Sequence, residues 1–164
     1  MADAVLRREA EFGINMAREH HPELASVPLT TDRYVLICHH THPLAKRRRA
    51  TWAQPKPYPL IFAGEVSGNR TLLDPVLDAN RLALRSFYEV QRSSTAMGLV
   101  AQGVGIAVVP GLAVQEGAYP DVRRIQLVEP VVSRSLVLIT RKSAHLSPAA
   151  QALYDMILTK ESKN

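Results

Sequence analysis

Two short polar turns carry the side chains best suited to bind a ligand. Ser67, Asn69 and Arg70 follow a predicted strand and precede a predicted helix. Ser93, Ser94 and Thr95 lie at the same kind of junction farther along the chain. Backbone N–H groups at a helix start lack partners, and the helix dipole favours negative charge, so such turns suit an anion such as a carboxylate. The guanidinium group of Arg70 can donate two parallel hydrogen bonds to such an anion. The alternative is plain helix capping by the hydroxyl groups, with no ligand.

Catalytic chemistry finds little support in the spacing of residues. The serine of Gly64–Gly68 is the fourth residue of its segment, whereas a hydrolase nucleophile turn needs it third. Gly103 and Gly105 follow a helix and precede a strand, which reverses the order of a dinucleotide-binding turn. The sequence shows no pair of acids and no nucleophile with a base. We therefore expect neither an enzyme nor a bound cofactor.

Five of the six histidines lie between His20 and His42. Their spacing matches no metal-ligand signature, and no acid or cysteine joins them at a telling distance. His39 and His40 are adjacent, so on a strand their side chains would point to opposite faces. We therefore predict surface histidines and no metal site.

The composition is that of a globular protein. The 164 residues, 46% of them hydrophobic, suffice for one substantial core or two small lobes. No apolar run approaches the length of a membrane span, and the first residues lack an export-signal pattern. The single cysteine, Cys38, ends an apolar run, which predicts a buried thiol in a cytoplasmic protein.

Much of the formal net charge of +5 comes from Lys46–Arg49. Its neighbours in the sequence indicate a solvated loop or helix edge. No aromatic side chains interleave with these cations, as base stacking would require. A non-specific contact with nucleic acid through this run is therefore an alternative, not the main prediction.

Strands and helices that alternate along the chain must position the polar turns. Residues 93–110 predict a hydroxyl-capped helix that Gly103 closes, then a strand buried on both faces that Pro110 stops. A helix is predicted through residues 72–77, and Pro75 fits it better if Asp74 caps a fresh start there. Ser147 is expected to cap a last helix with an apolar stripe. Further strands are predicted at 27–29, 34–38, 59–63, 83–90, 122–127 and 135–140. This order implies an α/β fold with mostly parallel strands.

The order of short motifs resembles the effector-binding domain of LysR-type transcriptional regulators. Matching segments run through nearly the whole chain, at 8–14, 27–29, 34–38, 42–45, 51–52, 59–61, 68–70, 94–110 and 146–150. The resemblance implies a two-lobed α/β fold like that of type 2 periplasmic binding proteins. Lobe I would comprise residues 1–31 and 130–164, and lobe II residues 32–129. The first strand, helix and second strand of the family would precede Met1, so lobe I would be incomplete.

The resemblance also implies a function, the sensing of a small inducer that controls transcription. A carboxylate or aromatic inducer would lie in the cleft between the lobes, near Asn15, Met16, Ser67, Asn69, Arg70, Ser94 and Thr95. The full-length protein would be a homodimer or tetramer that binds DNA through a helix–turn–helix domain absent from this chain. It would not contact a membrane. The alternative is a solute-binding protein of the same fold that serves a transporter.

Overall fold

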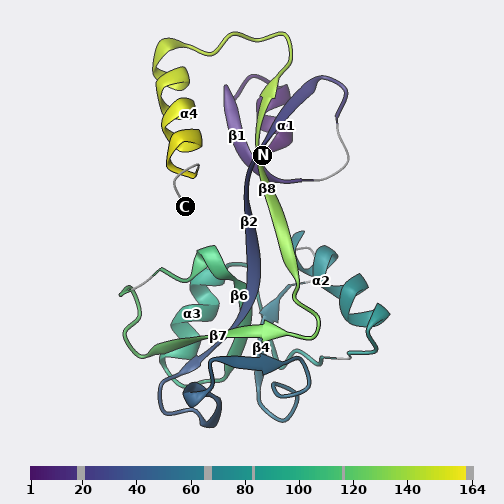
Figure 1. Cartoon of the computed structure of the whole chain (residues 1–164), viewed down its shortest axis with the longest axis vertical. Helices are drawn as coiled ribbons and strands as arrows, with labels where there is room; N and C mark the ends of the chain where they lie inside the picture. Colours follow the sequence, from purple (N-terminus) through teal and green to yellow (C-terminus); the bar gives the residue numbers. More distant parts are fainter. Residues whose placement is uncertain (18–20, 65–67, 83, 116, 162–164) are drawn as a thin grey trace. The chain divides into compact units, whose positions relative to one another are not determined.

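A strand of 16 residues, β2 (Leu24–His39), belongs to both parts of the chain. In the computed structural model, unit 1 comprises Met1–Asp32 and Arg134–Asn164, and unit 2 comprises Arg33–Ser133. The structure describes residues 1–17, 21–64, 68–82, 84–115 and 117–161 (Figure 1). Two separate strands were predicted within β2, with a break at 30–33. The break is absent because Thr30 and Thr31 are β-branched residues that favour extended backbone.

Unit 2 contains a mixed sheet. Its strands are the second half of β2, β3 (Arg49–Thr51), β4 (Leu60–Ala63), β5 (Tyr88–Val90), β6 (Ile106–Pro110) and β7 (Val122–Val128). β4 runs parallel to both β5 and β6, and β3 runs parallel to β7. β2, however, is antiparallel to β6 and β7. The prediction of mostly parallel strands is therefore too simple.

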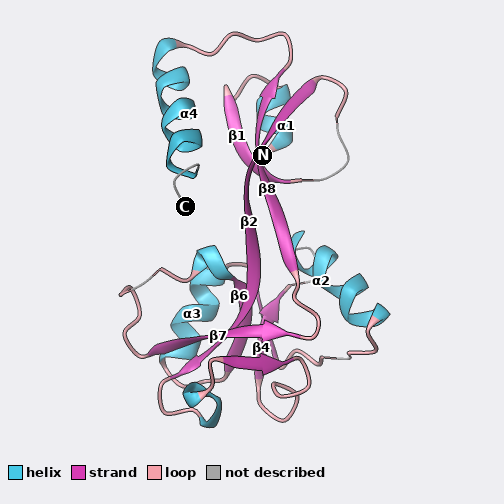
Figure 2. Cartoon of the chain, viewed as in Figure 1, coloured by secondary structure: helices cyan, strands magenta, loops and turns pink. Residues whose placement is uncertain are grey.

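Helices cover both faces of this sheet, α2 (Gly68–Ala79) on one side and α3 (Ser93–Ala101) on the other (Figure 2). Side chains alternate along β2, so Leu36 packs with Trp52 and the α2 face, while Ile37 packs with Val100 and the α3 face. All five residues of β6 are buried, as predicted for a strand covered on both faces.

Helix α2 begins earlier than predicted and contains Pro75 in its interior. Asp74 does not start a new helix, because its carboxylate accepts hydrogen bonds from Arg70 one turn earlier. Leu73 and Leu77 anchor the helix in the core. The Pro75 side chain is exposed, so its ring does not disturb this packing. β5 is also shorter than the predicted strand at 83–90.

Unit 1 contains α1 (Ala2–Leu6), β1 (Phe12–Met16), most of β8 (Ser133–Arg141) and α4 (Pro148–Glu161). β1 pairs with β8 in an antiparallel register. Ser147 caps α4 as predicted, since its Oγ accepts a hydrogen bond from Ala150 N at 3.3 Å. The predicted apolar stripe of α4 is only partly buried, because Leu153 is 52% exposed.

The described residues of unit 2 also form two short 3₁₀ helices, η1 (Pro43–Lys46) and η2 (Gly111–Ala113). The basic run leaves η1 at Lys46 and enters β3 at Arg49, so its last residue belongs to a strand. Among the described residues, no helix has the length and apolar character needed to span a bilayer.

Candidate functional site

The two predicted polar turns meet at the carboxyl ends of β4 and β5. Ala63 lies opposite Val90 in the parallel register, and Gly64 N donates a hydrogen bond to Val90 O at 3.0 Å. The chain enters α2 after β4 and α3 after β5, so the starts of both helices reach the same edge of the sheet. Ligands of open α/β sheets bind at such an edge.

A small hollow of about 20 Å³ lies between these helix starts. Its polar lining comes from Asn69 on α2 and Ser93 on α3, together with Gln91 and Arg92. Tyr34 Oη donates a 2.9 Å hydrogen bond to Asn69 Oδ1. The hollow has room for about one water-sized group. It can therefore hold a single polar group of a ligand, but not a whole metabolite.

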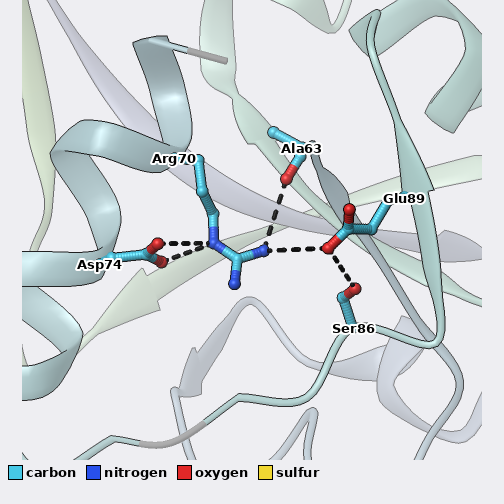
Figure 3. A network of polar contacts seen from close by, with 5 residues as sticks. All are labelled: Ala63, Arg70, Asp74, Ser86 and Glu89. Carbon is cyan, nitrogen blue, oxygen red and sulfur yellow. Dashed lines mark hydrogen bonds and ion pairs between the residues drawn. The ribbon is translucent and has the colours of Figure 1, made fainter. Parts of the chain in front are cut away.

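Arg70 is engaged by carboxylates of unit 2 (Figure 3). Its Nε donates to both carboxylate oxygens of Asp74 at 2.6 and 2.8 Å. Its Nη1 lies 3.5 Å from Ala63 O and 3.7 Å from Glu89 Oε1. Its Cζ lies 4.7 Å from the centroid of the Phe62 ring. These contacts join the first turns of α2 to β4 and β5. Arg70 was predicted to bind an anionic ligand, but two carboxylates of the chain already oppose its positive charge.

Helix α3 begins without the predicted hydroxyl cap. Its N-cap residue is Arg92, which makes no side-chain capping bond. Ser94 and Thr95 are exposed, whereas Ser93 lines the hollow. The predicted contacts from this turn were Ser94 and Thr95, whereas Ser93 and Gln91 line the hollow. At the other end, Gly103 has a φ of +72° and closes the helix as predicted.

The other predicted site residues are distributed differently. Asn15 and Met16 are half-buried at the end of β1 in unit 1, opposite Val137 and Leu136 of β8. Ser67 lies outside the described residues. Of the four predicted residues in the described part of unit 2, Asn69 lines the hollow, whereas Arg70, Ser94 and Thr95 are not among its lining residues.

Two of the arguments behind the histidine prediction need correction. His39, His40 and Asp121 offer possible metal-ligand atoms that all lie within 4.8 Å of one another. His40 Nδ1 is 3.3 Å from Asp121 Oδ1. The argument from opposite strand faces is wrong because β2 ends at His39. An acid does join the histidines, since the pairing of His39 with Val122 places Asp121 beside this turn. The types of donor are those that bind zinc in proteins.

Burial alters the acidity of two groups near this end of the sheet. It raises the pKa of the Cys38 thiol to about 11, and the predicted buried thiol is confirmed. It also lowers the pKa of His42, whose Nδ1 accepts a hydrogen bond from Leu44 N at the start of η1. With a pKa of about 11 the Cys38 thiol stays protonated near pH 7, so it is a poor nucleophile there.

The sequence matches the LysR substrate binding domain family over residues 1–161. It is 40% identical over 156 residues to the uncharacterized HTH-type transcriptional regulator YbhD of Escherichia coli, covering 95% of this chain and 49% of that protein. It is 31% identical over 157 residues to the corresponding regulator YfeR of Shigella flexneri, covering 94% and 50%. The chain thus spans about half the length of these relatives. Both are transcriptional regulators, and this disfavours the alternative of a transporter's solute-binding protein.

Solved structures give the same result. The effector-binding domain of QuiR in complex with shikimate superposes with a TM-score of 0.82 at 25% identity, covering 99% of this chain and 77% of that one. The regulatory domain of CcmR from Synechocystis PCC6803 in complex with 2-PG gives a TM-score of 0.80 at 19% identity, covering 98% and 77%. The mixed α/β fold is the periplasmic-binding-protein-like fold of these domains. The chain therefore belongs to the LysR substrate-binding domain family and is an effector-binding domain of the LysR type.

Proposed function

We propose that this chain binds a small organic acid or aromatic metabolite, and that the polar edge of unit 2 forms one wall of the binding site. The observation that carries the proposal is the hollow between Asn69 and Ser93 at the carboxyl edge of parallel strands. A carboxylate oxygen fits a space of about 20 Å³. The rest of the ligand would extend past the exposed hydroxyl groups of Ser94 and Thr95.

The roles within this wall follow from the contacts. Asn69 and Ser93 would contact the ligand. Arg70 would act mainly as a positioning residue, since Asp74 and Glu89 already oppose its charge. Removing Arg70 would leave these two carboxylates without their shared cation next to the anionic ligand, and this would weaken binding indirectly.

We also propose that unit 1 is lobe I and unit 2 is lobe II of the regulatory domain. The contact boundaries after Asp32 and after Ser133 support this division, since lobe II was predicted at 32–129. Asn15, Met16 and Ser67 would then supply further contacts to the ligand. Ligand binding would shift the population between two arrangements of the lobes.

In the whole protein, we propose, this domain regulates transcription and performs no catalysis. The relatives carry the name HTH-type, and this supports DNA binding through a separate helix–turn–helix domain. A homodimer or tetramer in the cytoplasm, with no membrane contact, completes the proposal. The QuiR complex with shikimate supports a small-molecule effector.

Calorimetry with shikimate, 2-PG and a panel of small aromatic and aliphatic carboxylates tests the binding site. Losing a hydrogen bond to a charged group costs about 1.5–3 kcal/mol, so Asn69→Ala and Ser93→Ala should each weaken a bound carboxylate by about tenfold or more. Asn80→Ala is the matched control, because Asn80 is an exposed asparagine just beyond the end of the same helix. Equal affinity in all variants would contradict the proposal that Asn69 and Ser93 contact the ligand. No binding to any compound of the panel would contradict carboxylate sensing.

A further inference from the structure

Unit 2 carries a second hollow, of about 760 Å³. It is separate from the effector wall, the proposed binding surface around Asn69 and Ser93. We call it the basic hollow. Six of its lining residues are cations, and they come from two distant segments of the chain: Lys46, Arg47, Arg48, Arg49, Arg123 and Arg124. The other two lining residues are Ala45 and Gln126. None of the eight lining residues is an acid.

Strand register brings the two basic segments together. β3 and β7 run in parallel with Arg49 opposite Gln126, and Gln126 N donates a hydrogen bond to Arg48 O at 3.1 Å. Ile125 and Leu127 of β7 are buried, so Arg124 and Gln126, which alternate with them along the strand, are exposed on the opposite face. Ala50 is buried next to Arg49 in the same way. Arg49 of β3 and Arg124 of β7 therefore lie on one exposed face of the sheet, and Arg123, also exposed, precedes Arg124 on the strand.

In the described part of the chain, none of these cations has a carboxylate partner. Among the described residues, ion pairs form at Arg7, Arg70 and Arg134, but at none of the six cations of the basic hollow. A neighbouring hollow shares Arg47 and Arg49 and adds a single acid, Glu129. Like charges held this close repel one another, and an anionic partner would relieve that repulsion.

The chemistry of the lining selects the kind of anion. Five of the six cations are guanidinium groups, which match the oxygens of a phosphate. The hollow has no aromatic side chain on which unpaired bases could stack. Its single apolar side chain is that of Ala45, so it lacks the apolar anchor typical of a protein interface. A duplex backbone needs neither feature, because its phosphates are held by charge alone.

We propose that the basic hollow binds the phosphate backbone of duplex DNA without reading its sequence. The proposal does not depend on effector binding, since none of the six cations lines the hollow at Asn69 and Ser93. It adds a DNA contact made by the effector-binding domain itself.

Fluorescence anisotropy of this chain with a short labelled duplex of mixed sequence, measured at increasing salt, tests the proposal. The test variant is Arg47→Ala/Arg49→Ala/Arg124→Ala. The control variant is Arg33→Ala/Lys56→Ala/Arg85→Ala, which removes three exposed cations of unit 2 outside the basic hollow. Both variants lower the formal net charge from +5 by three, to +2. Arg49→Gln/Arg124→Gln keeps longer side chains and replaces the triple variant if that variant folds poorly.

Each phosphate contact adds about 0.9 to the slope of log affinity against log salt. We therefore expect the test variant to lose about 2 to 3 from this slope and about tenfold or more in affinity at low salt, while the control keeps its slope. Equal losses in both variants would show a general charge effect and overturn the proposal. So would the absence of duplex binding. Binding of a poly-glutamate peptide through the basic hollow, without duplex binding, would instead identify an acidic protein as the partner.

Discussion

Removing Arg134 should destabilise the fold strongly, because it would leave a buried carboxylate without its cation. Asp32 is only 3% exposed, and its Oδ2 accepts hydrogen bonds from Nε and Nη2 of Arg134 at 3.0 and 2.8 Å. Breaking such a pair from one side costs about 3–5 kcal/mol, a large share of the roughly 5–15 kcal/mol that stabilises a typical domain. For Arg134→Met this corresponds to a fall in Tm of roughly 6–20 °C.

The double variant Asp32→Asn/Arg134→Met separates charge burial from lost packing. It removes both charges of this pair, so it should be more stable than Arg134→Met alone. Urea unfolding followed by circular dichroism reports on the whole chain. The fluorescence of Trp52, the single tryptophan, reports on unit 2, where this side chain is fully buried. Arg33→Met is the control, because Arg33 is the exposed neighbour of Asp32. A loss below about 1 kcal/mol for Arg134→Met, the value of a surface pair, would refute the argument, as would a double variant no more stable than the single one.

Three further predictions concern single residues. Because the pKa of Cys38 rises from 9.0 to about 11, its thiolate fraction near neutral pH falls about 100-fold, so a disulfide reagent should react far more slowly with the native chain than with the urea-unfolded chain. The stability that this pKa shift contributes is fully present below pH 9.0 and is lost as the pH rises through about 11. Reaction rates of the native and unfolded chains within tenfold of each other would contradict the raised pKa of Cys38. Pro75→Ala should raise the free energy of unfolding by about 1–3 kcal/mol in urea melts, since an exposed proline interrupts the hydrogen bonds of α2, and a lower stability would argue against this. NMR titration should give His42 a pKa below 6.5, because burial disfavours its charged ring. The stability contributed by the neutral ring is present above pH 6.5 and is lost as the pH falls through the pKa of the folded state. A measured pKa at or above 6.5 would contradict the burial argument.

Sequence periodicity was sufficient where an element is determined locally. The run at 106–110 has no polar residue and ends in proline, so its burial and its end could both be predicted. Ser147 with Pro148 identified a helix start in the same way. Strand direction was harder to predict, because the antiparallel pairing of β2 with β6 and β7 joins residues far apart in the chain. Pro75 misled the prediction of α2 because the buried Leu73 and Leu77 outweigh a local helix breaker.

The place of the candidate site was easier to predict than its residues. Strand-to-helix junctions are visible in the sequence, so both polar turns could be predicted. Which hydroxyl faces the hollow depends on the rotation of α3, and each residue turns a helix by about 100°. That rotation exposes Ser94 and Thr95 and directs Ser93 to the hollow. The engagement of Arg70 by Asp74 follows helical i,i+4 spacing, but the sequence also allowed Asp74 to be a cap.

The surface chemistry away from the effector wall depends on one strand, β7. Its antiparallel register with β2 places Asp121 beside His39 and His40, and its parallel register with β3 places Arg124 beside the basic run. A slip of one residue would direct Arg124 into the core and Ile125 to solvent, so the burial of Ile125 and Leu127 fixes both surface clusters. The basic run alone indicated a solvated loop. Together with the arginines of β7, the basic run forms a concave cationic surface. The burial of Ile125 and Leu127 on one face of the sheet determines which charged side chains meet on the other.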